Sequence, residues 1–233
     1  MIEITALATG SKGNCYHVTD GKTPILLECG IKFREIQKKL NFQTSNLVGC
    51  LVTHEHKDHC AGIKDITKAG INVYMSQGTA ESLNVKHHRI KTIKAKQQFQ
   101  IETWTILPFD VEHDVSEPLG FLLMNQQGEK LLFATDTYYI KYKFNGLTHI
   151  MIECNYSMEI LNENIASGRV PKVMKKRLLR SHFSLENVKD FLKANNLSKV
   201  QEIWLLHLSD NNSDEKLFKK EIQALTGKMV YIP

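Results

Sequence analysis

The feature that most constrains this chain is a cluster of histidines directly behind a short apolar run. The run, residues 48–52, reads as a buried strand, and the next seven residues are Thr53-His54-Glu55-His56-Lys57-Asp58-His59. Side chains two positions apart in an extended segment point to the same side, so His54 and His56 should face one way. Asp58 and His59 follow where the chain should turn into a helix, and they can aim at a point beside the first pair.

This cluster indicates a metal site. Three imidazoles and a carboxylate that converge within one turn of chain are typical ligands of divalent metal ions. Solvated imidazoles gain little from such crowding, and protonated imidazoles would repel one another. A set of merely exposed histidines is therefore the weaker interpretation, and the spacing favours metal binding.

The composition indicates a soluble globular protein, with 42% hydrophobic and 24% charged residues. We expect one domain over residues 1–233, because no segment resembles an interdomain linker. No apolar run is long enough to span a bilayer and residues 1–5 lack a signal-peptide pattern, so we expect a cytoplasmic protein. The five cysteines include no Cys-x-x-Cys pair and are expected to be buried thiols. Cys60 could approach a metal, but burial is the favoured interpretation.

The net charge of +5 is unevenly distributed. Residues 86–96 hold five lysines and arginines, residues 169–180 hold six, and neither stretch contains an acid. One-sided stretches of this kind suit a polyanionic partner such as nucleic acid. The alternative for either stretch alone is a solvated protein face.

Hydrophobic patterning predicts alternating strands and helices, that is, the α/β class. The predicted strands are residues 2–8, 14–19, 24–28, 48–52, 71–75, 99–107, 130–135, 149–153, 200–206 and 229–232. The predicted helices are residues 33–40, 60–68, 78–83, 185–194 and 213–225, with a further helix from residue 158 and a helix or loop over 169–180. A glycine-rich turn over residues 9–14 could present backbone N–H groups to a phosphate, although a plain hairpin turn explains it equally well.

The His-x-His-x-Asp-His pattern resembles the signature of the metallo-β-lactamase superfamily, whose fold is a four-layer αβ/βα sandwich. The resemblance implies that His54, His56 and His113 hold one divalent ion and that Asp58, His59 and His207 hold a second. It also implies that Asp136 bridges the two. Zn²⁺ and Mn²⁺ suit these ligands, and Fe²⁺ is accepted by the same set. In the superfamily the third strand usually ends in an Asp, and here this position holds Glu28, whose side chain is longer than that of Asp.

Several further segments resemble YycJ/WalJ-type proteins, which are small DNA exonucleases of this superfamily. These segments are residues 9–14, 113–120, 153–155, 182–187 and 207–212. The resemblance implies a phosphodiesterase for which DNA is favoured over RNA as the substrate, with Asp58 and His182 as catalytic residues. It also implies substrate contacts from Ser11, Asn14, Asn155 and His182.

Two alternatives remain open from the sequence. One is a small-molecule hydrolase of the same fold, such as a PhnP-like cyclic phosphodiesterase or a glyoxalase II-like thioesterase. The other is a non-enzymatic nucleic-acid-binding protein whose metals are structural. The dependence of substrate binding on salt separates the first from a nuclease, and the completeness of the ligand set argues against the second.

Overall fold

The computed structural model describes residues 1–233, which divide into two units. Unit 1 comprises Met1–Asp110 and Val115–Glu129, and unit 2 comprises Val111–Asp114 and Lys130–Pro233. Each unit is an α/β structure, as the alternation of strand and helix patterns predicted. None of the helices is long and apolar enough to cross a bilayer.

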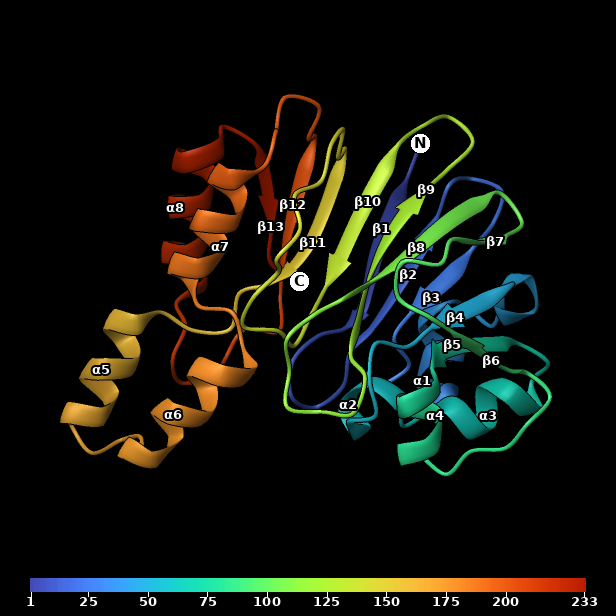
Figure 1. The fold of residues 1–233 in the computed structure, drawn as a ribbon, viewed down its shortest axis with the longest axis horizontal. Helices are drawn as coiled ribbons and strands as arrows, with labels where there is room; N and C mark the ends of the chain where they lie inside the picture. Colours follow the sequence, from blue (N-terminus) through green and yellow to red (C-terminus); the bar gives the residue numbers. More distant parts are fainter. The chain divides into compact units, whose positions relative to one another are not determined.

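Unit 1 contains a six-stranded mixed sheet in the order β1-β2-β3-β4-β5-β6 (Figure 1). The strands are β1 (Glu3–Ala8), β2 (Cys15–Thr19), β3 (Ile25–Leu27), β4 (Gly49–Leu51), β5 (Asn72–Ser76) and β6 (Ile90–Ile93). β1, β2 and β3 pair antiparallel, and the pairs from β3 to β6 are parallel. Every residue of β3 and β4 is buried, as expected for central parallel strands covered on both faces.

The helices of unit 1 bury their apolar side chains against this sheet. They are α1 (Phe33–Lys39), α2 (Lys57–Cys60), α3 (Ile63–Lys68) and α4 (Gln77–Ser82), with a 3-10 turn, η1, at Thr44–Asn46. Ile36 of α1 and Ile66 of α3 join Cys50 and Val73 of the strands in one core cluster. The helix predicted over residues 60–68 is two short helices, α2 and α3, because the chain turns at Ala61-Gly62.

Unit 1 also contains an antiparallel set of three strands, β7 (Phe99–Ile101), β8 (Trp104–Asp110) and β9 (Leu119–Met124). The single strand predicted over residues 99–107 was wrong, because these residues form a hairpin that turns at Glu102 and Thr103. Glu102 adopts a left-handed backbone with φ of 49°. No glycine or proline marks the turn, so the alternating pattern runs through it unbroken.

Unit 2 is built on four parallel strands in the order β13-β12-β11-β10 (Figure 1). They are β10 (Lys130–Ala134), β11 (His149–Glu153), β12 (Glu202–Leu206) and β13 (Met229–Tyr231). The helices are α5 (Met158–Ala166), α6 (Lys172–Ser181), α7 (Leu185–Ala194) and α8 (Glu215–Thr226). α7 contacts α8, and α8 contacts β13. Ser184 caps α7 by accepting the backbone N–H of Asn187, and α8 ends at Gly227.

The carboxyl ends of parallel strands collect the polar side chains of each unit. In unit 1, Glu28 follows β3 and the histidine cluster follows β4. In unit 2, Asp136 follows β10, Glu153 ends β11 and His207 follows β12. Since parallel strands end at the same edge of a sheet, this edge is where α/β proteins usually bind ligands.

Candidate metal centre

Glu28 organises the ligand loop of unit 1. Its carboxylate is fully buried, accepts the backbone N–H of Thr53 at 3.2 Å, and lies 3.6 Å from His59 Nδ1. Burial raises the pKa of Glu28, and its contacts with His59 and Thr53 oppose that rise. The longer side chain therefore reaches the loop, and it holds His59 with Nδ1 toward the acid and Nε2 on the other side of the ring.

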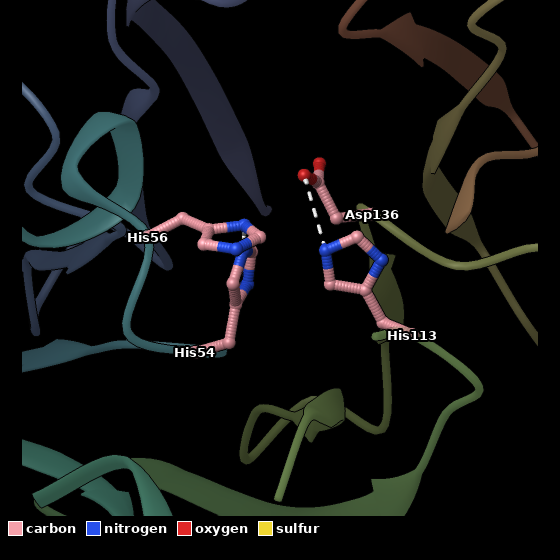
Figure 2. A group of neighbouring side chains, drawn as sticks. All are labelled: His54, His56, His113 and Asp136. Atoms are coloured by element: carbon pink, nitrogen blue, oxygen red, sulfur yellow. Dashed lines mark hydrogen bonds and ion pairs between the residues drawn. The ribbon is translucent and has the colours of Figure 1, made fainter. Parts of the chain in front are cut away.

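The three imidazoles of unit 1 lie together. His54 Nε2 is 3.0 Å from His56 Nδ1, and the two rings meet edge to face (Figure 2). The ring centroids of His54 and His59 are 4.2 Å apart. Thr53 Oγ1 lies 2.8 Å from His54 Nδ1, so Nε2 is the atom of His54 that could bind a metal ion. The predicted convergence of these side chains is therefore confirmed within the unit.

A close backbone approach fixes the loop that carries Asp58. The carbonyl of Asp58 accepts the N–H of Asn14 at 2.6 Å, and Gly30 donates to the carbonyl of Asn14 at 2.8 Å. A Cβ at Gly30 would lie 1.6 Å from the Asp58 carbonyl oxygen, so only glycine fits here. Asp58 Oδ2 is then 3.3 Å from His59 Nε2.

Unit 2 contributes His113, Asp136 and His207. His113 Nε2 is 3.8 Å from Asp136 Oδ2, the dashed line in Figure 2, and His207 Nδ1 is 3.2 Å from Asp136 Oδ1. His113 Nδ1 lies 2.9 Å from the carbonyl of Ser181, to which it can only donate. Burial lowers the pKa of His113, which favours the neutral ring that a metal ligand requires, with Nε2 directed toward Asp136.

Glu153 lies at the centre of the unit 2 cluster. Its Oε1 is 2.6 Å from His182 Nδ1 and 3.1 Å from His207 Nδ1. Its Oε2 accepts the backbone N–H groups of Thr137 and Phe183 at 3.1 and 3.2 Å. One ligand atom from each of Asp136, Glu153, His182 and His207 lies within 4.8 Å of the others. The fully buried Glu153 thus orients two histidines at once.

His182 is held as an imidazolium. Burial of the ring acts to lower its pKa, but the charge and hydrogen bond of Glu153, together with the charges of Asp136 and Asp114, raise the pKa of His182 to about 9. The same pairing lowers the pKa of Glu153 against the effect of its burial. With Nδ1 directed at Glu153, His182 Nε2 carries the second proton and can donate it or bind an anion.

Three site residues occupy a strained backbone. Glu28, Asp136 and His207 have φ of 64°, 46° and 53°, in the left-handed region that non-glycine residues rarely adopt. Each such conformation costs on the order of 1 kcal/mol and persists where the surroundings hold it. At His207 the side chain of Asn155 donates to the backbone carbonyl at 2.8 Å. All three strained residues follow the ends of strands, where the candidate site residues lie.

The predicted substrate contacts occupy different environments. Ser11 is exposed in the glycine-rich turn, whereas Asn14 is fully buried. Asn14 Nδ2 lies 3.2 Å from His59 Nε2, and its Oδ1 accepts the N–H of Gly10 at 2.9 Å. Asn155 is buried against His207. Substrate contact by these residues stays a prediction, and the hydrogen bonds indicate that Asn14 and Asn155 also position the ligand loops.

The sequence interpretation missed Glu153 as a site residue. Its segment, residues 153–155, was part of the resemblance to YycJ/WalJ-type proteins, but no role was assigned to the acid. Asp136 was assigned from the resemblance, and both acids stand at the end of an apolar strand. Cys60 follows the favoured interpretation: it is buried, its thiol donates to the carbonyl of Glu55, and burial raises its pKa to about 12. It is a structural thiol.

The donor chemistry of both units fits divalent metal ions. The donors are imidazole nitrogens and carboxylate oxygens, which suit Zn²⁺, Mn²⁺ and Fe²⁺. The ring orientations of His54, His59 and His113 are set by hydrogen-bonding or charged partners on Nδ1. Such partners normally support histidines that ligate metals.

Comparison with known proteins places this arrangement in a family. Residues 23–164 match the family described as "Beta-lactamase superfamily domain". The exodeoxyribonuclease YycJ of Bacillus anthracis is 28% identical over 246 residues, which cover 97% of this chain and 90% of the relative. The exodeoxyribonuclease WalJ of Streptococcus pneumoniae is 27% identical over 228 residues, which cover 91% of this chain and 83% of the relative.

Solved structures agree on the fold. The metallo-β-lactamase fold protein YhfI from Bacillus subtilis superposes with a TM-score of 0.75 at 16% identity, covering 100% of this chain and 95% of the other. A diphosphatase from the PhnP family gives a TM-score of 0.66 at 14% identity, with the same coverage. These likenesses concern the fold alone, and they confirm the predicted α/β class and the metallo-β-lactamase fold.

Proposed function

The chain belongs to the metallo-β-lactamase superfamily, and we propose that it is a divalent-metal-dependent nuclease that hydrolyses phosphodiester bonds at DNA ends. The observation that carries this proposal is the likeness to exodeoxyribonucleases over 97% of the chain. A donor of the metal-binding kind stands at every position where the resemblance predicts a ligand.

We assign the ligands to two sets. His54, His56, His113 and Asp136 would hold one ion, and Asp58, His59, Asp136 and His207 would hold the second. Bound divalent ions would lower the pKa of water and neutralise charge on the phosphate under attack. Asp136 would serve both ions, since two cations stabilise one ionised carboxylate.

Side chains of the protein would orient the attacking water and supply the proton. Asp58 would accept a hydrogen bond from the attacking water and orient it toward the phosphorus. His182 Nε2 would donate its proton to the leaving oxygen, or a hydrogen bond to a phosphate oxygen, because Glu153 keeps the ring charged. Glu153 would act as a positioning residue, since it is fully buried and hydrogen-bonds to His182.

Helix α6 supports a polyanionic substrate. It carries Lys172, Lys175, Lys176, Arg177 and Arg180 without an acid, and it leads directly into His182. Lys175 Nζ donates to Asn162 at 2.6 Å, and the other four basic side chains are exposed. A helix face of this composition favours contact with successive phosphates over one small anion.

The test is a degradation assay with linear single-stranded, linear double-stranded and closed circular DNA, run with Zn²⁺, Mn²⁺ and Fe²⁺ in turn. The proposal expects loss of nucleotides from the linear substrates with at least one of these ions and an intact circle. Intact linear DNA, together with rapid hydrolysis of a small phosphodiester or thioester, would contradict it. A steep fall in DNA affinity with rising salt separates the nuclease from a small-molecule hydrolase.

A further inference from the structure

Unit 2 contains a pocket of about 270 Å³ between the loop that follows Asp136 and one face of helix α7. We call it the aromatic pocket, and its defining residues are Tyr139, Lys141, Tyr142, Lys143, Phe183 and Phe191. Its volume lies just below the range of about 300–1,000 Å³ that is usual for drug-sized ligands. The space therefore suits one planar ring system and not an extended molecule.

The pocket is preformed by ordinary packing. Asn187, Phe191 and Ala194 of α7 line it, and their spacing of four and three residues places them on one helix face. Phe183 and Phe191 are buried and form the apolar bottom of the pocket. The opposite wall is tied to the helix by the N–H of Phe144, which donates to Asn195 Oδ1 at 2.7 Å. A ligand would meet a fixed cavity.

At two points the pocket is close along the chain to the unit 2 cluster of Asp136, Glu153, His182 and His207. Tyr139 is three residues after Asp136, so their Cα atoms are no more than about 11 Å apart. Thr137 Oγ1 donates to the carbonyl of Tyr139 at 2.9 Å, which fixes this short connection. Phe183, at the bottom of the pocket, is the residue directly after His182. A ring in the pocket would therefore lie near the segments that carry Asp136 and His182.

The lining has the chemistry of a nucleotide site. Tyr139 is 56% exposed, which leaves its ring open for stacking. Lys141 and Lys143 line the pocket and are exposed, and Lys141 Nζ is 5.4 Å from the centre of the Tyr142 ring. Asp190 also lines the pocket, is exposed, and lies 3.7 Å from Lys193; its carboxylate can accept hydrogen bonds from an amino group. Aromatic walls with cations at the rim match a base that carries a phosphate.

We propose that the aromatic pocket binds one unpaired nucleobase of the DNA strand whose phosphate lies at His182. This inference rests on the proposed nuclease function and deepens it, because it assigns the substrate as a single-stranded end. A base that is stacked and paired in a duplex cannot insert its ring into the pocket, so duplex ends must fray before they bind there.

The experiment measures binding of a fluorescent single-stranded 12-mer with non-hydrolysable phosphorothioate linkages. Matched oligonucleotides lack the base at the first or at the last nucleotide. Wild-type protein is compared with Tyr139→Ala, with Tyr139→Phe, and with the control Tyr231→Ala. Tyr231 is also an exposed aromatic of unit 2, but its ring already stacks on Trp204 at 4.9 Å.

The proposal expects Tyr139→Ala to weaken binding of the intact 12-mer by roughly 5- to 150-fold, the range for one base stacked on an aromatic. Tyr139→Phe should bind like wild type, and Tyr231→Ala should change nothing. For the oligonucleotide that lacks the bound base, wild type and Tyr139→Ala should bind equally, since the interaction is already gone.

Equal binding of the intact 12-mer by wild type and Tyr139→Ala would overturn the pocket proposal and leave the nuclease function standing. An equal loss with every oligonucleotide, including both that lack a base, would overturn it as well. Failure of wild-type protein to bind or degrade any DNA would instead refute the proposed function itself. Circular dichroism of each variant checks the fold, which an exposed side chain should not disturb.

Discussion

Replacing Glu153 by glutamine tests the role of the buried acid in unit 2. The change removes the charge and keeps the shape, and one amide oxygen remains to accept a backbone N–H from Thr137 or Phe183. Its main consequence falls on His182, whose Nδ1 is 2.6 Å from the Glu153 carboxylate. In metal-free protein the pKa of His182 should fall from about 9, because Glu153 is the largest of the groups that raise it and burial of the ring persists in the variant.

The size of the stability effect follows from that shift. The interval between the ordinary pKa of 6.5 and about 9 corresponds to about 3 kcal/mol of stabilisation of the charged ring. Since the folded-state pKa is raised, this stabilisation is fully present below pH 6.5 and is lost as the pH rises through about 9. The wild type should therefore exceed Glu153→Gln in stability most at pH 6 and much less at pH 10.

The assay is urea unfolding of both metal-free proteins at pH 6, 8 and 10, together with an NMR titration of the His182 ring. A difference of about 3 kcal/mol at pH 6 would move the urea midpoint by about 1 M. A His182 pKa that stays near 9 in the glutamine variant would refute this reasoning. A stability difference that is the same at all three pH values would refute it too.

Three further substitutions test other parts of the account. Lys176→Glu on α6 should reduce the slope of log Kd against log salt for DNA by about 1, whereas Lys219→Glu, the same charge change on α8, should leave the slope unaltered. Gly30→Ala places a methyl 1.6 Å from the Asp58 carbonyl and should destabilise the protein by about 3 kcal/mol or more; a melting temperature within about 2 °C of wild type would contradict this. Asp58→Ala should lower both metal content and DNA degradation, and full activity in that variant would favour a structural metal.

Most of the fold could be predicted because short-range sequence patterns indicate its strands. The strand over residues 149–153 and the helix over residues 185–194 were predicted with the bounds observed for β11 and α7. The strand is an apolar run that ends at a polar residue, and the helix begins after a capping residue. Both signals come from residues that are close in sequence. The loop histidines were predictable for the same reason, since a two-residue spacing after a buried strand fixes their direction.

The rest depends on contacts between residues that are distant in sequence. Glu153 and His182 are 29 residues apart, and no local pattern announces that they meet. The hairpin at Glu102 escaped prediction because the turn uses a residue with a Cβ at positive φ, where glycine would have marked it. The aromatic pocket joins residues 139–143 with residues 183–195, so only the fold assembles it.

The central claim is the proposal that this chain holds two divalent ions. The most direct measurement is the metal content of the purified protein, by mass spectrometry of the elements, for wild type and for His54→Ala and His207→Ala. We expect about two ions per chain in the wild type and fewer in each variant. At most one ion in the wild type, or unchanged content in both variants, would contradict the account.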